Sequence, residues 1–348
     1  MSAGVVRSCV RVTRGLECDI TETFNYADYF AQISVLGDLL RDNPERAWLT
    51  TMPPDPDPRQ YVVWLGCNVL RTVHIVETLD DILKHIGVDY VMLGGPANCC
   101  GVQHARRDQP EAGRRMAWST FDKFELFQPE KLLFWCPSCD HRVAGMGDDV
   151  SELVAKRQHV TEFFAEHLDL FDFKPLEKPQ RVALHTHKGS PQQDIDARST
   201  RNLLSAIPGV EVVDVPAMTE LGFHCASPEV VKMPPAQLRS ILNTSIAEAQ
   251  SLGVDTLVTI YHACHRELIP PSIAADAETA FGPIAVENYL TIVARALGLP
   301  EHVDRYKHFV ELGDPQQIMA ELGPRVAELG LPPHRAEKFI ASQFSRRS

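Results

Sequence analysis

The sequence of 348 residues lacks the long apolar runs that mark membrane and exported proteins. No stretch approaches the roughly 18 consecutive apolar residues of a membrane-spanning helix, and the first residues, MSAGVVRSCVRVTRG, contain no apolar segment of a signal peptide. Acidic residues outnumber basic residues, 46 against 34, so the net charge is −12. These absences predict a cytoplasmic protein with reduced cysteines, no direct membrane span and no nucleic acid as partner.

Nucleotide-binding signatures are absent as well. No G-x-G-x-x-G follows a predicted strand, and the string HKGSPQQ at 187–193 departs from the phosphate-loop pattern G-x4-G-K-[ST]. A bound dinucleotide is therefore not expected, so the electrons for a redox reaction must come from elsewhere. Of the nine cysteines, Cys9 and Cys18 have no partner at a metal-like spacing, and we interpret them as free thiols.

Five other cysteines follow the spacing C-x31-C-C-x35-C-x2-C. They are Cys67, Cys99, Cys100, Cys136 and Cys139. Adjacent cysteines do not easily bond each other, because disulfide geometry is too demanding. Thiolates select iron–sulfur clusters, zinc and Cu(I), and five thiolates are one more than a tetrahedral zinc needs. The spacing therefore favours a multi-iron cluster, and the alternative is a set of ordinary core or redox cysteines.

Each of these cysteine groups comes at or just after the end of a predicted strand. Apolar, β-branched and aromatic runs predict strands at 61–67, 88–93 and 131–136, and helical spacing predicts helices at 71–86 and about 110–126. Alternating strands and helices indicate a parallel sheet, in which sites form at the carboxyl ends of the strands. The sequence thus predicts that the five cysteines gather at one edge of a sheet.

The same order of elements returns at strands 181–187, 211–215 and 254–261. Thirty-eight residues separate Cys100 from Cys139, and thirty-eight also separate Cys225 from Cys264. The correspondences that follow are Cys225 with Cys100, Cys264 with Cys139, His224 with Cys99, Tyr261 with Cys136 and His187 with Cys67. An internal repeat of this size indicates two copies of one structural unit.

We therefore predict an α/β protein with two related Rossmann-like modules, whose parallel sheets form a pseudo-two-fold repeat, followed by C-terminal helices. The predicted divisions are an N-terminal extension and linker at 1–60, a first, intact module at 61–145, a connector at 146–180, a second, degenerate module at 181–283 and a C-terminal helical segment at 284–348.

The strings PANCCG at 96–101 and WCPSC at 135–139, with both long spacers, closely resemble the CCG domain. This is the cysteine-rich module of the B-type subunit of heterodisulfide reductase and of bacterial heterodisulfide-reductase-like subunits, where it normally occurs twice. The resemblance covers 60–145 strongly and about 180–270 in degenerate form. It implies a non-cubane [4Fe–4S] cluster held by the five thiolates of the first module.

The second module departs from that pattern, because only two of its five ligand positions keep cysteine. The candidate ligands are His187, His224, Cys225 and Cys264, and His185, His262 and His265 stand close enough in sequence to substitute. A mixed nitrogen and sulfur set suits zinc or a mononuclear iron. A metal site, a polar pocket for substrate or catalysis, and a vestigial site all stay open.

The resemblance implies an oxidoreductase subunit of a heterodisulfide-reductase-like complex, in which electron transfer is coupled to thiol and disulfide chemistry, with sulfur oxidation as one such setting. Its expected partners are iron–sulfur or flavin subunits and a thiol or disulfide substrate or carrier protein. No catalytic residue is assigned. The alternatives are an electron-relay or docking subunit without catalysis, and an α/β protein stabilised by zinc.

Overall fold

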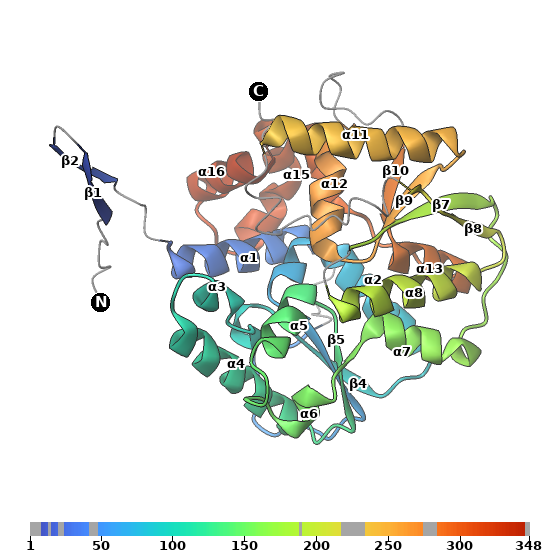
Figure 1. The fold of residues 1–348 in the computed structure, drawn as a ribbon, viewed down its shortest axis with the longest axis horizontal. Coiled ribbons are helices and arrows are strands. Elements are labelled where there is room, and N and C mark those ends of the chain that lie inside the picture. Colours follow the sequence, from blue (N-terminus) through green and yellow to red (C-terminus); the bar gives the residue numbers. More distant parts are fainter. Residues whose placement is uncertain are drawn as a thin grey trace.

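The computed structural model describes residues 8–12, 15–19, 24–41, 48–187, 190–216, 234–273 and 284–344. Two parallel four-stranded sheets form the body of the molecule (Figure 1). The first consists of β4 (Tyr90–Gly94), β3 (Tyr61–Gly66), β5 (Lys131–Phe134) and β6 (Gln158–His159), in that spatial order. The second consists of β8 (Val210–Val213), β7 (Gln180–His185), β9 (Thr256–Thr259) and β10 (Ala285–Asn288).

The predicted pseudo-repeat is confirmed by the identical strand orders of the two sheets. The first sheet is covered by α2 (Val73–His85), α4 (Pro110–Glu125) and α7 (Val160–Glu166), and the second by α8 (Pro191–Ser205), α11 (Pro235–Ser251) and α13 (Tyr289–Leu297). Helix α7 packs on α8 of the other module, and α13 packs in return on α2. This reciprocal exchange is the packing expected of a pseudo-two-fold pair.

Strand β3 shows why the first sheet is buried on both faces. Its side chains alternate, as the pleat of a strand requires. Val63 and Leu65 enter the large core that is continuous with the second module, whereas Val62 and Trp64 enter a smaller core under α4. All four are fully buried. A run of consecutive apolar residues is therefore needed here, as in other parallel sheets covered by helices on both sides.

Two strands differ from the sequence prediction. The segment 284–348 is predicted to be helical, but Ala285–Asn288 is the edge strand β10 and pairs with β9. Its counterpart β6 pairs with β5 inside the stretch predicted to be a connector. Neither strand has the continuous apolar run that marks the central strands, because β6 is Gln158–His159 and β10 includes Glu287 and Asn288. Only their pairing reveals them.

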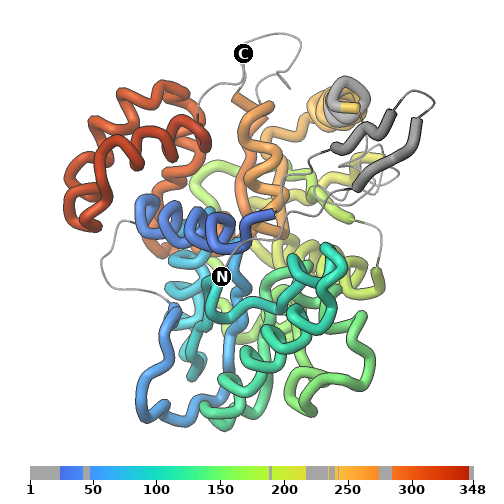
Figure 2. Tube along the Cα trace, turned by 90° about the vertical axis from the view of Figure 1, so that its left-hand side faces the viewer, coloured from blue at the N-terminus to red at the C-terminus, as the bar shows by residue number. Residues whose placement is uncertain are grey.

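The N-terminal part, predicted to be an extension and linker, contributes a helix to the core. Helix α1 (Tyr26–Leu40) buries Ile33, Leu36 and Leu40 against the large core, and Figure 2 shows it lying across the body beside the C-terminal helices. Before it, β1 (Ser8–Val12) and β2 (Gly15–Asp19) pair with each other as an antiparallel hairpin.

The C-terminal segment completes the molecule with three helices. They are α14 (Arg305–Leu312), α15 (Pro315–Glu328) and α16 (Pro333–Phe344). The guanidinium of Arg325 donates to the carbonyl of Asp38 at 2.9 Å, which fixes α15 to the end of α1. Among the described helices, none is both long and apolar enough to cross a membrane.

Candidate metal centre

The five predicted cysteines of the first module lie together at the carboxyl edge of its sheet. Cys67 follows β3, the Cys99–Cys100 pair follows β4 through the short helix η2 (Pro96–Asn98), and the last two flank the start of α5 (Pro137–Ala144) after β5. All five are buried and free of disulfides, and the most accessible, Cys67, is 7% exposed. Parallel strands that lie side by side bring their carboxyl ends to one place, so the predicted gathering is observed.

The sulfur atoms form a continuous series of neighbours. The Sγ atoms of Cys67 and Cys99 are 3.8 Å apart. Cys99 is also hydrogen-bonded to Cys100, and Cys100 to Cys139, which in turn is bonded to Cys136. This buried all-sulfur donor set fits an iron–sulfur cluster, because thiolates are the ligands that such clusters take in proteins.

Two glycines near the sulfur atoms occupy positions where a side chain would clash with its neighbours. Gly66 has φ +75°, and a Cβ there would lie 3.0 Å from both the Cβ of Cys136 and the Sγ of Cys139. Gly101, at φ +73°, faces the backbone of Gly113, where a Cβ would lie only 2.1 Å from the carbonyl oxygen. The backbone N–H of Gly101 donates to the Sγ of Cys99 at 3.4 Å. Backbone donors of this kind tune the potential of a bound cluster.

The turn that carries Cys99 is held by hydrogen bonds from buried side chains. The amide of Asn98 donates to the carbonyls of Leu49 at 3.0 Å and Gly94 at 2.8 Å. The indole N–H of Trp64 donates to the carbonyl of Asn98 at 2.9 Å, and the Thr120 hydroxyl donates to that of Cys99 at 3.0 Å. Side chains of β3, of α4 and of η2 therefore hold the turn that carries Cys99 in place.

Contacts among the five thiols lower the pKa of some of them and raise the pKa of the others. Hydrogen bonds with Cys100 and Cys67 lower the pKa of Cys99 well below its ordinary value, and the bond with Cys139 lowers the pKa of Cys136. The bond with Cys99, together with burial, raises the pKa of Cys67 well above its ordinary value. The pKa values of Cys100 and Cys139 are raised as well. A metal that binds all five cysteines must therefore displace protons.

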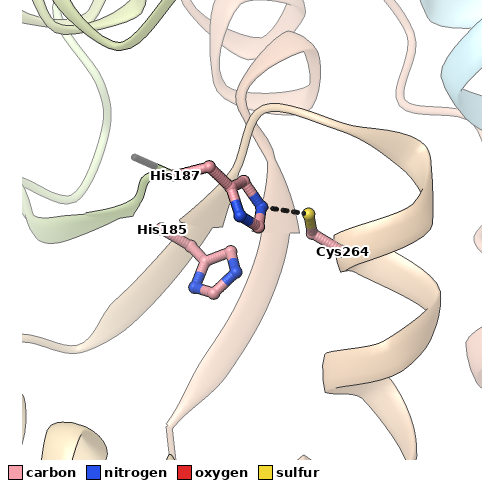
Figure 3. A group of neighbouring side chains, drawn as sticks. All are labelled: His185, His187 and Cys264. Atoms are coloured by element: carbon pink, nitrogen blue, oxygen red, sulfur yellow. Dashed lines mark hydrogen bonds between the residues drawn. The ribbon is translucent and has the colours of Figure 1, made fainter. Parts of the chain in front are cut away.

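In the second module, the structure brings His185, His187 and Cys264 together (Figure 3). The Nε2 of His187 lies 2.9 Å from the Sγ of Cys264, and the rings of the two histidines stand 5.0 Å apart and nearly perpendicular. One ligand atom from each residue falls within 4.8 Å of the others, and all three side chains are buried. Of the four predicted ligands, His187 and Cys264 meet here, whereas His224 and Cys225 lie outside the described residues.

The pairing of strands refines the expected correspondence between the modules. Trp64 is the partner of Phe134 in the first sheet, and His185 is the partner of Thr259 in the second. Phe134 and Thr259 are equivalent in the repeat, so His185 occupies the position of Trp64. Counted along the strand, His187 then corresponds to Gly66, so the predicted correspondence of His187 with Cys67 is wrong by one residue. Cys264 keeps the predicted position of Cys139, in the first turn of α12 (His262–Ile273).

The other candidate, His265, points away to a different group. Its Nε2 lies 2.6 Å from the carboxylate of Asp304, and the Nδ1 of His74 lies 3.5 Å from the same carboxylate. Although burial raises the pKa of Asp304, these two histidines hold it below its usual value. The carboxylate also accepts the backbone N–H of Lys307 and so caps α14. This group joins the two modules to the C-terminal helices.

A buried series of hydrogen bonds and close contacts connects the two sites, and no pattern in the sequence indicates it. The Nε2 of His159 donates to the carbonyl of Trp135 at 3.0 Å, beside Cys136. Asp196 lies 3.3 Å from the other ring nitrogen of His159 and accepts a hydrogen bond of 2.5 Å from the hydroxyl of Tyr261. The ring of Tyr261 lies 5.7 Å from that of His187. Tyr261, at the position of Cys136, therefore bridges the modules rather than binding a metal.

Comparison with known proteins agrees with this architecture. The model of the cysteine-rich domain CCG matches residues 61–144 and again 187–269. Two stretches of the chain, one in each module, thus match this cysteine-rich domain. A solved structure of a hypothetical protein from Helicobacter pylori is similar at a TM-score of 0.46 and 11% identity, covering 80% of this chain and 55% of the other.

The curated relatives are D-type subunits of dihydromethanophenazine:CoB–CoM heterodisulfide reductase. The chain is 27% identical over 278 residues to that of Methanosarcina barkeri (strain Fusaro) and 25% identical over 281 residues to that of Methanosarcina acetivorans. Each match covers 75% of this chain and 64% of the relative, so the chain spans less than two thirds of these proteins. Its homology is thus to the D-type subunit, whereas the resemblance seen in the motifs is to the B-type subunit and its bacterial relatives.

Proposed function

We propose that this protein is the iron–sulfur redox subunit of a heterodisulfide-reductase-like complex. The observation that carries the proposal is the meeting of five buried cysteine sulfurs from three strand ends, in a domain that matches the CCG model. In this proposal, Cys67, Cys99, Cys100, Cys136 and Cys139 hold one non-cubane [4Fe–4S] cluster, which supplies one-electron transfer. The protein chain contributes the ligands, the N–H of Gly101 at Cys99 and a water-poor surrounding.

The second module would hold a single zinc or iron ion. Its proposed ligands are His187 and Cys264, with His185 beside them and with His224 and Cys225 available in sequence. The short contact between the Nε2 of His187 and the Sγ of Cys264 supports this, because imidazole and thiolate ligands together suit these metals.

The proposed reaction joins this centre to thiol and disulfide chemistry. A disulfide takes up two electrons and two protons and yields two thiols, so a partner subunit with an iron–sulfur or flavin group must deliver the electrons. Homology to a heterodisulfide reductase subunit supports this class of complex. A sulfur-oxidising setting, a carrier protein that presents the thiol and a cytoplasmic location complete the proposal.

Iron and acid-labile sulfide analysis of anaerobically purified protein tests the first site. We expect about four irons per chain in the wild type and their loss in the Cys99→Ala, Cys100→Ala double variant. Cys264→Ser is the matched control, because it removes a buried thiol of the second module. Wild-type protein that folds but holds no iron after reconstitution would refute the proposal, as would a double variant with unchanged iron.

The same samples test the second site and the reaction. His187→Ala and Cys264→Ser should lose one zinc or iron ion while the iron–sulfur absorption is retained. Reduction of small disulfides with a low-potential electron donor separates a catalytic subunit from an electron-relay or docking subunit. A relay would pass electrons to an added acceptor protein without consuming disulfide.

A further inference from the structure

Three basic side chains gather where the two modules meet beside Cys67. Arg71 ends the short helix η1 (Asn68–Arg71), directly after that cysteine, and η1 packs against α12 of the second module. Helix α12 contributes His262 and Arg266, which lie one turn apart on it. His262 is only 2% exposed. The cluster thus joins a residue four positions after Cys67 to a residue two positions before Cys264.

Within the described part of the chain, these groups have polar atoms without partners. The Nε atoms of both arginines and the Nδ1 of His262 are buried and make no hydrogen bond. No described carboxylate forms an ion pair with Arg71 or Arg266, whereas the half-buried Arg157 is paired with Asp140. Buried donors without acceptors are costly, so native proteins seldom keep three of them together without a ligand.

Aromatic rings hold the two guanidinium groups in place. Arg71 lies over the ring of Tyr29, with 5.9 Å between the guanidinium carbon and the ring centre, and Arg266 lies over Tyr306 at 5.6 Å. A guanidinium that packs by its face against an aromatic ring keeps its N–H edge available for a planar, bidentate ligand. The cluster therefore presents fixed donors rather than mobile surface charges.

Charges in the cluster reinforce one another. Burial lowers the pKa of Arg71, and the neighbouring guanidinium of Arg266 lowers it further. The positive potential is thus left for a ligand to neutralise.

We propose that Arg71, Arg266 and His262 form a binding site for a small oxyanion, the carboxylate or phosphate group of a metabolite. Two guanidinium forks and one imidazole nitrogen match the several oxygens of such a group. The inference goes beyond the proposed redox function, because anion binding requires neither a cluster nor turnover. If the proposed disulfide chemistry holds, the same site would fix the acidic end of the substrate between the two metal sites.

Calorimetric titration of the full-length, iron-loaded protein with inorganic phosphate and, separately, with oxalate tests the site. The buffer should contain chloride as the only other anion. We expect saturable binding of at least one probe, weakened at least about tenfold in Arg71→Gln and in Arg266→Gln, since each removes a bidentate donor. The tighter of the two probes identifies the headgroup. Arg201→Gln, which removes an exposed arginine paired with Asp214, should bind as the wild type does.

Thermal unfolding gives a second measurement of the same binding. The melting temperature of the wild type should rise with phosphate or oxalate, because a ligand that binds only the folded state stabilises it. Arg71→Met should remove that rise. Absence of binding by the wild type would overturn the inference, as would equal binding by the wild type and both glutamine variants. If the variants shift only the reduction potential of the iron–sulfur centre, the arginines balance cluster charge and the anion site is refuted. Iron content, measured on the same samples, reports separately on the proposed cluster.

Discussion

At the scale of single residues, the turn that carries the adjacent cysteines depends on a position where no side chain fits. Gly101→Ala would place a Cβ 2.1 Å from the carbonyl oxygen of Gly113, at a φ of +73°. We expect the free energy of unfolding to fall by about 3 kcal/mol or more, because backbone strain and overpacking add. Urea unfolding of the protein measures this.

The matched control is Gly147→Ala. Gly147 has a similar φ of +59°, but nothing lies within 4 Å of the added Cβ. Its cost should therefore be the conformational strain alone, about 1 kcal/mol. Equal losses in the two variants would show that the close approach of Gly101 to Gly113 does not matter.

The residues of the first site can be predicted from the sequence because their spacing is itself the signal. Cys67, Cys99 and Cys136 each follow an apolar run that forms a strand, and parallel strands place their ends together. Asp196 and Arg71 cannot be found in this way. Their roles come from contacts with residues of the other module, far away in sequence, and neither stands in a recognisable pattern.

At the scale of elements, His159 and Asn288 are equivalent residues that begin the helices α7 and α13. Each side chain accepts the backbone N–H two residues on, and each reaches back to a carbonyl at the end of the central strand, Trp135 in one module and Ile260 in the other. The edge strand, the cap and the following helix are therefore fixed together in both modules.

Removing one of these caps should be costly. Asn288→Ala would leave the N–H of Leu290 and the carbonyls of Thr259 and Ile260 without their partner in a fully buried place. We expect a loss of about 2–3 kcal/mol in the free energy of unfolding, measured by chemical denaturation. Thr244→Ala removes an exposed hydroxyl on α11 and should change stability by less than about 0.5 kcal/mol. A loss as small as that for Asn288→Ala would contradict the role given to the cap.

Elements with a clear apolar pattern can be predicted from the sequence, and those without one cannot. The central strands β5 and β9 have only four residues each, but they lie in apolar runs, whereas β6 consists of Gln158 and His159 and half of the residues of β10 are polar. Their strand conformation is imposed by a neighbouring strand and by a capped helix. Helix α1 was likewise not predicted. Its apolar face becomes meaningful only in the folded protein, where it packs against the large core.

At the scale of the whole molecule, the group of His74, His265 and Asp304 connects both modules with α14, and it should make stability depend on pH. Burial lowers the pKa of His74 to about 4, from an unfolded value of 6.5. Between these two values the unfolded chain binds a proton that the folded protein excludes. Stability is therefore retained above pH 6.5 and is lost as the pH falls toward 4, by about 2 kcal/mol at pH 5.

Chemical denaturation at pH 8 and at pH 5 measures this dependence. His74→Asn, which cannot take up the proton, should show a smaller loss between the two values than the wild type does. His308→Gln serves as the control, because His308 is 42% exposed and paired with Glu321. An unchanged pH dependence in His74→Asn would mean that other groups cause the loss.

The difference between the two halves also has an evolutionary consequence. Where the first module has Cys136, the second has Tyr261, whose hydroxyl bonds Asp196, and Asp196 accepts in turn from Thr161 of the first module. Cysteine at 261 would leave this buried carboxylate short of a donor, and His224 would still stand at the position of Cys99. No single substitution therefore makes a five-thiolate site in the second module, and the change at 261 costs a buried hydrogen bond. Stepwise conversion of one kind of module into the other would pass through a less stable protein.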